Sequence, residues 1–179
     1  MNTDNQLLLL VDENDTFLGK YEKRKVCHYG KGVRHRAFVT LVENKNGEVL
    51  LQKRKHKLWD NFWDTSAISH NLHINDHDET YEEAGNRALT SEMGIPFVNL
   101  KKIGGFSYFA KYGENCENEY CAILTGKYNG QVIVNDKVAY GYVWMKKEEF
   151  IRQCLVKNKE YTPWAILTGE FLEKLAKKQ

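Results

Sequence analysis

Residues 79–95, with the sequence ETYEEAGNRALTSEMGI, decide the fold because they contain a helix together with the signals that start and stop it. The pattern is helical from Thr80 to Met93, and Gly94 is the residue type that most often follows the last turn of a helix. The polar run Asp76 to Glu79 comes directly before. We expect Asp78 to be the N-cap, because its side chain can accept a hydrogen bond from a free backbone N–H group.

Strand signals surround this helix on both sides. Val39 to Val42 and Val49 to Gln52 are apolar runs separated by Asn44-Lys45-Asn46-Gly47, which is typical of a β-hairpin turn. Further strands are expected at Gln6 to Val11, Thr65 to Ile68, Lys102 to Tyr108, Glu119 to Leu124, around Val132, and at Tyr140 to Met145. Further helices are expected at Lys146 to Cys154 and from Thr162-Pro163 onward. This order predicts an α/β (α+β) protein, a mixed β-sheet between helices, in one domain covering residues 1–179.

Composition narrows the function. Apolar residues make up 42% of the 179 residues, enough for a core, and the net charge of +2 gives no strong attraction to nucleic acid or to a membrane surface. The apolar start, Gln6 to Val11, is too short to span a membrane and has no basic leader. The four cysteines show no CxxC spacing, so we expect reduced thiols in a cytoplasmic protein that works as a monomer or homodimer.

Three histidines and two glutamates are the candidate metal ligands. Glu117 and Glu119 are two residues apart in a predicted strand, so both carboxylates should leave the same face. His28 and His35 flank the sequence Tyr-Gly-Lys-Gly, which is flexible enough to fold two donors onto one point. With His70, this mixture of nitrogen and oxygen donors suits a divalent metal ion.

The segment from Glu79 to Ile95 resembles the strand-loop-helix-loop signature of Nudix proteins, through Glu79, Arg87 and the run Ser91-Glu92-Met93-Gly94-Ile95. The resemblance implies a Nudix fold and a diphosphate-linked substrate. A hydrolytic Nudix helix would be expected to carry carboxylates where this chain has Ala88 and Ser91, so Glu92 alone stands in a metal-binding place. A single helix carboxylate is poorly suited to hydrolysis, because several carboxylates are usually needed to hold the metal ions that activate water.

More specifically, the chain resembles type I isopentenyl-diphosphate isomerases from about Gln6 to Leu175. The matching features, in order, are the segment from Glu22 to His35 with its two histidines seven residues apart, Trp63 to Ser66 before His70, Phe106-Ser107-Tyr108, Glu117-Asn118-Glu119, and Thr162-Pro163-Trp164. Several separated matches in the same order carry more weight than any single motif.

The isomerase resemblance implies roles for individual residues. The histidine/glutamate cluster would hold a divalent ion, with Mg²⁺ expected and Mn²⁺ or Zn²⁺ as alternatives, and Glu92 would hold a second ion. Glu119 and Tyr108 would be catalytic, and the ring of Trp164 would stabilise a carbocation. The substrate is expected to be a small-molecule diphosphate, with its phosphates bound by basic residues drawn from Lys23, Arg24, Arg54 and Lys57.

The sequence departs from the isomerases at the position of their active-site cysteine, which is Ile68 here. An aliphatic side chain cannot donate or accept a proton. The pKa of the neighbouring Ser69 hydroxyl is too high for it to replace a thiol in proton transfer. Cys27 and Cys116 could substitute only if their loops bring a sulfur into the cavity. Three hypotheses therefore stay open: an isomerase of isopentenyl-type diphosphates, a Nudix hydrolase of a nucleoside or prenyl diphosphate, and a non-catalytic diphosphate-binding protein.

Overall fold

The fold is an α+β arrangement, described by a computed structural model for residues 3–156 and 158–178. The helices are α1 (Arg24–Cys27), α2 (Tyr81–Met93), α3 (Lys147–Val156), the short 3₁₀ helix η1 (Asn158–Glu160) and α4 (Pro163–Ala176). The strands are β1 (Leu7–Val11), β2 (Phe17–Lys23), β3 (His35–Glu43), β4 (Glu48–Arg54), β5 (Trp63–Asp64), β6 (Ala67–His70), β7 (Leu72–Ile74), β8 (His77–Asp78), β9 (Lys101–Tyr112), β10 (Asn115–Lys127) and β11 (Ala139–Lys146).

Strand β3 organises the sheet. It pairs in parallel with β10 and antiparallel with β6, while β10 also pairs antiparallel with β9, and β4 with β11. The sheet is therefore mixed. In these registers His35 is opposite Glu119, and Ala37 is opposite His70. The pairing thus brings three candidate ligands, distant in the sequence, to one end of β3.

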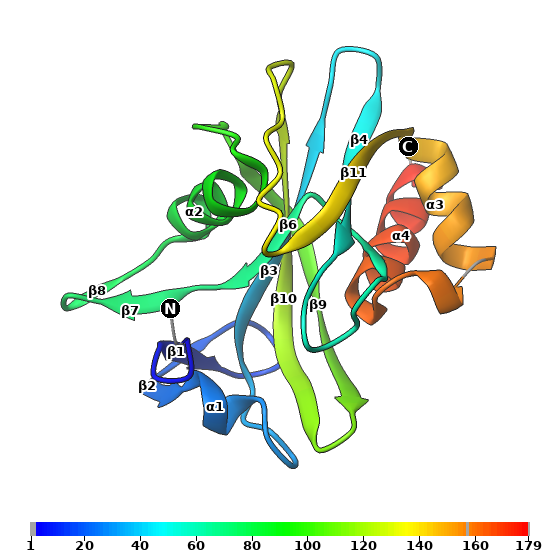
Figure 1. Cartoon of the computed structure of the whole chain (residues 1–179). Helices are drawn as coiled ribbons and strands as arrows, with labels where there is room; N and C mark the ends of the chain where they lie inside the picture. The colour runs from blue at the N-terminus through cyan, green and yellow to red at the C-terminus, as the bar shows by residue number, and fades with distance from the viewer. Residues whose placement is uncertain (1–2, 157, 179) are drawn as a thin grey trace.

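Helices cover both faces of the sheet, as Figure 1 shows, with α2 on one side and the pair α3 and α4 on the other. The core under α2 contains Ala84, Ala88 and Leu89, packed against residues of β3, β4 and β10. The second core places Phe150 of α3 and Ala165 of α4 against the opposite face. The predicted mixed sheet between helices is confirmed.

The start of α2 corrects one prediction. The N-cap is Thr80 and not Asp78, because the Thr80 hydroxyl accepts a hydrogen bond from the Glu83 backbone N–H at 3.2 Å. The Glu83 carboxylate in turn accepts from the Thr80 N–H at 2.8 Å, which completes a capping box. Asp78 lies two residues earlier in β8, where its carboxylate accepts from Tyr21 and contacts His73. Gly94 ends the helix in the left-handed conformation, as expected.

Replacing Thr80 with Ala is expected to lower the free energy of unfolding by about 1 kcal/mol, because the first turn of α2 loses its capping acceptor. Urea denaturation of the variant and of the wild-type protein measures this difference. An unchanged free energy of unfolding would show that the capping box contributes nothing to stability.

The predicted strand around Val132 is wrong. Residues 131–138 belong to no strand, although Val132 is buried in the core under α2. The backbone N–H groups of Ile133 and Asn135 donate to the carbonyls of Met93 and Glu92 at the end of α2. The apolar residue at 132 therefore packs against a helix end, and its backbone hydrogen bonds go to that helix instead of to a sheet.

Other differences concern short elements. The strand predicted at Thr65 to Ile68 is correct only from Ala67, where β6 begins, because Thr65 and Ser66 lie between β5 and β6 and belong to neither. Strand β2 was not predicted because most of its side chains are exposed and leave no apolar alternation. The polar run before α2, read as a loop, includes β8, which joins β7 through a turn with positive φ at Asn75 and Asp76. Among the residues that the structure describes, none of the helices has the length and apolar character needed to cross a membrane.

Candidate metal centre and substrate cavity

Four separate elements supply the candidate ligands. His28 is the residue that ends α1, His35 begins β3, and His70 ends β6. Glu117 and Glu119 leave the same face of β10, as the two-residue period of a strand predicts. All of them are buried.

The loop between His28 and His35 depends on Gly32. Its φ is +61°, and a Cβ at this position would lie 2.5 Å from Cys116 Sγ and 2.6 Å from the Cys27 carbonyl oxygen. Only glycine fits so close to a neighbouring strand and to its own loop. The tight loop lets both histidine rings reach the same point, where they stack with centroids 5.1 Å apart.

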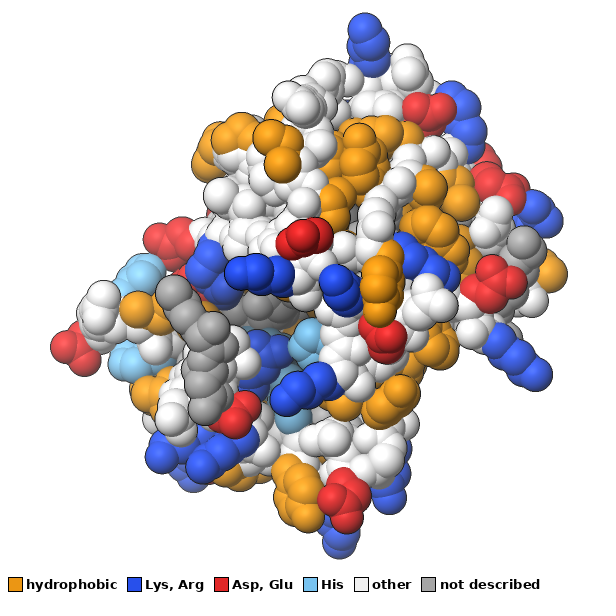
Figure 2. Space-filling view, viewed as in Figure 1, with side chains coloured by type: hydrophobic (Ala, Val, Ile, Leu, Met, Phe, Trp, Pro, Cys, Tyr) orange, Lys and Arg blue, Asp and Glu red, His pale blue; other side chains and the backbone are white. Residues whose placement is uncertain are grey.

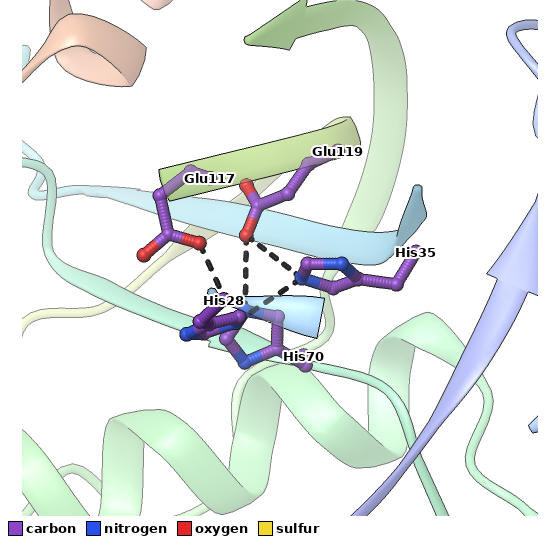
Figure 3. Close-up of side chains that lie close together, drawn as sticks. All are labelled: His28, His35, His70, Glu117 and Glu119. Carbon is purple, nitrogen blue, oxygen red and sulfur yellow. Dashed lines mark hydrogen bonds and ion pairs between the residues drawn. The ribbon is translucent and has the colours of Figure 1, made fainter. Parts of the chain in front are cut away.

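The donor atoms converge. One donor atom from each of the five residues lies within 4.8 Å of all the others. His28 Nε2 is 3.3 Å from His35 Nε2 and 3.4 Å from Glu117 Oε2. Glu119 Oε1 is 2.9 Å from His70 Nε2 and 3.4 Å from His35 Nε2. Figure 3 shows the side chains turned toward one another from opposite sides.

This arrangement fits a divalent cation. His35 Nδ1–H donates to the Val33 carbonyl at 2.8 Å, which leaves the Nε2 lone pair facing the cluster. Glu117 Oε2 is buried and has no hydrogen-bond partner. Lone pairs and carboxylates held this close repel one another unless a positive charge lies between them. Donors on opposite sides of an ion, each at about 2.0–2.3 Å, would be about 4–4.6 Å apart, close to the spread observed.

Burial keeps the imidazoles of His28 and His70 neutral, which is the form that binds metals. Burial lowers the pKa of His28 to about 2, helped by the charges of His70 and His35. It lowers the pKa of His70 to about 3, although the hydrogen bond with Glu119 opposes the shift. Burial raises the pKa of Glu117 well above its usual value, and the charge of Glu119 adds to this. For Glu119 burial acts in the same direction, but its contacts with His70 and His35 outweigh it and hold its pKa well below the usual value.

His28 and His70 are expected to lower the stability of the metal-free protein as the pH falls below 6.5, while Glu117 and Glu92, whose pKa values are raised, act in the opposite direction. The pKa values of His28 and His70 are lower in the folded chain than the 6.5 of an unfolded histidine, so their contribution is complete above pH 6.5 and is lost as the unfolded chain takes up protons. Urea denaturation in the presence of a chelator measures the slope. Over this pH range His70→Gln is expected to lose less stability than the wild-type protein does, and equal changes in the two proteins would contradict this assignment.

A cavity of about 340 Å³ opens beside the cluster. His70, Glu117 and Glu119 form part of its wall. Figure 2 shows Lys and Arg side chains gathered round a central hollow in which histidine side chains are visible. The remaining lining residues come from the N-terminal segment, α1, β4 and the loop after it, β6, α2, β9, the segment before β11, and α4: Thr3, Gln6, Arg24, Gln52, Arg54, His56, Ile68, Ser69, Arg87, Ser91, Glu92, Tyr108, Asn135, Val138 and Trp164.

Two of the four basic residues predicted to bind phosphate line this cavity and two do not. Arg24 and Arg54 are half-buried in its wall. Lys23 and Lys57 have exposed side chains outside it. Lys23 is the last residue of β2, one position before α1 begins, and it is exposed. Lys57 lies in the loop after β4, beyond the cavity rim.

Glu92 lies in the cavity wall but outside the five-residue cluster. Its Oε2 accepts a hydrogen bond from Gln52 Nε2 at 2.9 Å. Burial raises the pKa of Glu92 to about 7, against the effects of this hydrogen bond and of the charge of Arg54. No other carboxylate of α2 lines the cavity; Glu83, for example, belongs to the capping box at the start of the helix. Glu79, which precedes the helix, forms an ion pair with Arg87 at 2.6 Å and does not line the cavity either.

Another part of the cavity wall is apolar and aromatic. Ile68 packs in a cluster with Trp164 and Tyr108, and each of these side chains also lines the cavity. The Tyr108 hydroxyl donates to Glu119 Oε2 at 2.6 Å. Neither Cys27 nor Cys116 lines the cavity, and burial raises the pKa of both thiols, that of Cys27 to about 12. Among the described residues, no thiol therefore takes the place lost at Ile68.

Sequence reasoning missed three residues of this region. His56 lies in the cavity wall, although nothing in its sequence context distinguishes it from a surface histidine. Arg87 donates to the His70 carbonyl at 2.8 Å and so fixes the end of β6; its place in the Nudix-like signature was the available signal. Asp64 is completely buried between Arg54 and Trp164, and no motif marks it. His73 and His77, which were not taken as ligands, lie in β7 and β8.

Comparison with known proteins identifies the family. A NUDIX domain matches residues 33–165. The chain belongs to the Nudix family. The isopentenyl-diphosphate Delta-isomerase of Haloarcula marismortui is 32% identical to it over 151 residues, covering 80% of this chain and 78% of that protein. Isopentenyl-diphosphate Delta-isomerase 2 of Photorhabdus laumondii is 31% identical, covering 89% of this chain and 88% of the relative. The expected resemblance to isomerase-like Nudix proteins is confirmed.

Solved structures agree on the fold alone. DR0079 from Deinococcus radiodurans superposes with a TM-score of 0.63 at 18% identity, covering 83% of this chain and 88% of that one. A MutT protein from Methanosarcina mazei gives a TM-score of 0.63 at 18% identity, covering 80% of this chain and 96% of that one. The Nudix fold is therefore common to this chain and to both of these proteins.

Proposed function

We propose that this chain is a divalent-metal-dependent, isomerase-like enzyme acting on isopentenyl- and dimethylallyl-type diphosphates. The observation that carries the proposal is the short hydrogen bond between Tyr108 and Glu119, which lies beside the five-donor cluster and in the cavity wall. A carboxylate shared between histidines and a phenol is suited to moving a proton. Two relatives at about the same identity carry the name isopentenyl-diphosphate Delta-isomerase.

The diphosphate would bind at the polar side of the cavity. Arg24 and Arg54 supply positive charge there, and an arginine fork matches the geometry of phosphate oxygens. The five-donor cluster would hold a cation that binds and polarises the diphosphate oxygens. Three imidazoles favour Mn²⁺ or Zn²⁺ in that cluster, whereas the oxygen donor Glu92 suits Mg²⁺.

The hydrocarbon end would lie against the aromatic wall. Isomerisation adds a proton to one end of a double bond and removes a proton from a carbon at the other side, through a tertiary carbocation. Glu119 and Tyr108 would exchange protons with one face of this group, and the Trp164 ring would stabilise the positive carbon. Ile68, on the same wall, offers no second proton carrier.

One observation favours a second candidate, hydrolysis of a nucleoside or prenyl diphosphate. That reaction needs no thiol, and no cysteine lines the cavity among the described residues. The same cavity opposes it, because α2 contributes a single carboxylate, Glu92, for holding ions and activating water. A non-catalytic diphosphate-binding protein would need neither group.

Incubation of the purified protein with isopentenyl diphosphate and Mg²⁺, or Mn²⁺ in a parallel sample, separates these functions. Formation of dimethylallyl diphosphate, detected by mass spectrometry after chromatography, is the result expected here. Released phosphate or pyrophosphate instead would establish a hydrolase. Saturable binding with neither product would establish a non-catalytic binder and would overturn the proposed activity.

A further inference from the structure

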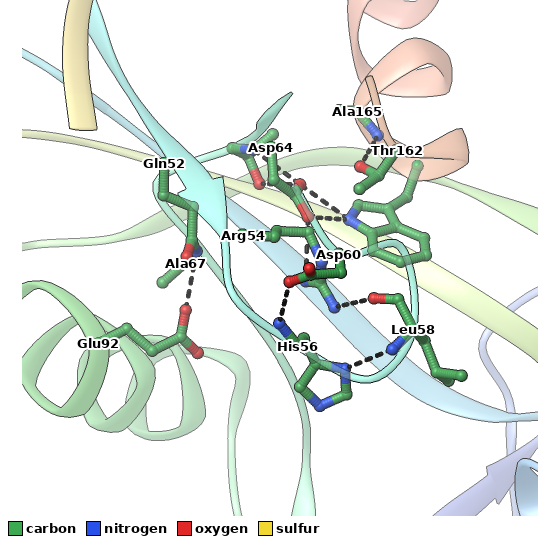
Figure 4. Close-up of polar contacts among 12 residues, drawn as sticks. Gln52, Arg54, His56, Leu58, Asp60, Asp64, Ala67, Glu92, Thr162 and Ala165 are labelled. Carbon is green, nitrogen blue, oxygen red and sulfur yellow. Dashed lines mark hydrogen bonds and ion pairs between the residues drawn. The ribbon is translucent and has the colours of Figure 1, made fainter. Parts of the chain in front are cut away.

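Asp64 is a buried charge that is hydrogen-bonded to two residues of the cavity wall. Its side chain is completely inaccessible to solvent. Each of its carboxylate oxygens lies 2.8 Å from Trp164 Nε1, and Oδ2 also accepts from Arg54 Nη1 at 3.1 Å. Oδ1 accepts from the Thr65 backbone N–H at 2.7 Å. Figure 4 shows Asp64 and Arg54 in this network of polar contacts.

Both main partners of Asp64 line the cavity. Arg54 is held at a second point, because its Nη2 donates to the Leu58 carbonyl at 3.3 Å, and its Nε has no partner. The guanidinium carbon of Arg54 is 5.1 Å from the centre of the Trp164 ring. Burying a carboxylate costs desolvation energy. A buried Asp64 bonded to both Arg54 and Trp164 is therefore suited to holding these two side chains in place.

We propose that Asp64 is a positioning residue that fixes Arg54 and Trp164 relative to each other and, through the indole N–H, strengthens the attraction of the Trp164 ring for a cationic carbon. An anionic acceptor at Nε1 polarises the N–H bond and moves electron density into the ring. A more negative ring face binds a cation more strongly. The inference rests on the proposed function and assigns to it a residue that touches neither substrate nor metal.

The carboxylate is ionised under ordinary assay conditions. Burial raises the pKa of Asp64 to about 6, against the opposing charge of Arg54 and the hydrogen bonds that it accepts. Measurements at pH 8 therefore compare a charged Asp64 with an uncharged replacement of the same shape. Asp64→Asn is that replacement. Asp60→Asn is a matched control, because Asp60 is exposed and accepts hydrogen bonds from the His56 backbone N–H and the Tyr140 hydroxyl.

Two diphosphate compounds of the same shape distinguish binding at the cationic carbon from binding at the phosphates. One has a dimethylammonium group and the other an isopropyl group in the place of the substrate's branched carbon. The ratio of their dissociation constants, measured by isothermal titration calorimetry with Mn²⁺ present, cancels any change in phosphate binding through Arg54. The wild-type protein is expected to bind the ammonium compound about tenfold or more tightly than its neutral partner.

Asp64→Asn is expected to reduce this preference at least threefold, while Asp60→Asn leaves it unchanged. Trp164→Phe removes the indole N–H, so adding Asp64→Asn to it should change the ratio much less than in the wild-type background. If the wild-type protein prefers the ammonium compound and Asp64→Asn keeps the same preference, the role proposed for Asp64 is overturned, but the proposed function is not. Failure of the wild-type protein to bind either compound overturns the proposed function as well.

A measurement on the wild-type protein keeps the proposal testable if Asp64→Asn does not fold. The indole N–H proton of Trp164, assigned in a ¹H–¹⁵N spectrum by its loss in Trp164→Phe, is expected downfield because it donates to a carboxylate. The ammonium compound should shift it further downfield than the isopropyl compound does. Equal shifts with both compounds would overturn the polarisation of the ring by Asp64.

Discussion

Glu119→Gln is expected to lower turnover of isopentenyl-type diphosphates by about 10³-fold or more while the protein stays folded. Glu119 is the one residue of the described chain that contacts His35, His70 and Tyr108 together. The amide cannot exchange a proton at neutral pH and binds a cation more weakly than a carboxylate does. Initial rates of dimethylallyl diphosphate formation measure the effect.

The matched control for this substitution is Glu114→Gln, on the exposed turn between β9 and β10, which should retain wild-type rates. Thermal melting and circular dichroism of both variants check the fold. The same substitution made in the background of Ile68→Cys keeps the test informative if wild-type turnover is slow. Undiminished turnover of Glu119→Gln in either background would remove Glu119 from the mechanism.

Ile68→Cys is expected to raise isomerase turnover by about 100-fold or more, or to create it. Ile68 lies in the cavity wall in one cluster with Tyr108 and Trp164, so a thiol there would face the substrate and supply a second proton carrier. The exchange of three carbons for one sulfur in this wall should cost about 1 kcal/mol of stability, too little to unfold the chain.

Ile68→Ala is the matched control for the enlarged cavity. It opens more space than cysteine but cannot carry a proton, so its turnover should stay at the wild-type level. Similar gains in both variants would attribute the effect to space instead of to proton transfer. No gain in folded, metal-loaded Ile68→Cys would show that the cavity serves another substrate.

Sequence patterns within single strands, loops and helices predicted the parts of the site that each of these elements forms by itself. The two-residue period of a strand placed Glu117 and Glu119 on one face, and β10 has that arrangement. The glycines between His28 and His35 indicated a tight loop, and Gly32 indeed has positive φ in close contact with Cys116. The helical pattern from Thr80 to Met93 and the terminating Gly94 predicted the helix that carries Glu92.

Features that depend on pairing between distant segments could not be derived from local patterns. His70 reaches the other ligands because β6 pairs with β3, and only the isomerase resemblance indicated this. Asp64 is an acidic residue in a polar context, yet the contacts with Trp164 across the sequence bury it. Lys23 and Lys57 have the right charge, but side-chain direction, which charge does not specify, turns them to solvent.

The central claim is that His28, His35, His70, Glu117 and Glu119 bind one divalent cation beside the cavity. The most direct test is an anomalous difference map, collected at the manganese edge, from crystals grown with Mn²⁺. We predict one strong peak among the five side chains, at about 2.0–2.3 Å from their donor atoms. A manganese-loaded crystal with no peak at that point, and with the five side chains bonded only to one another, would contradict it.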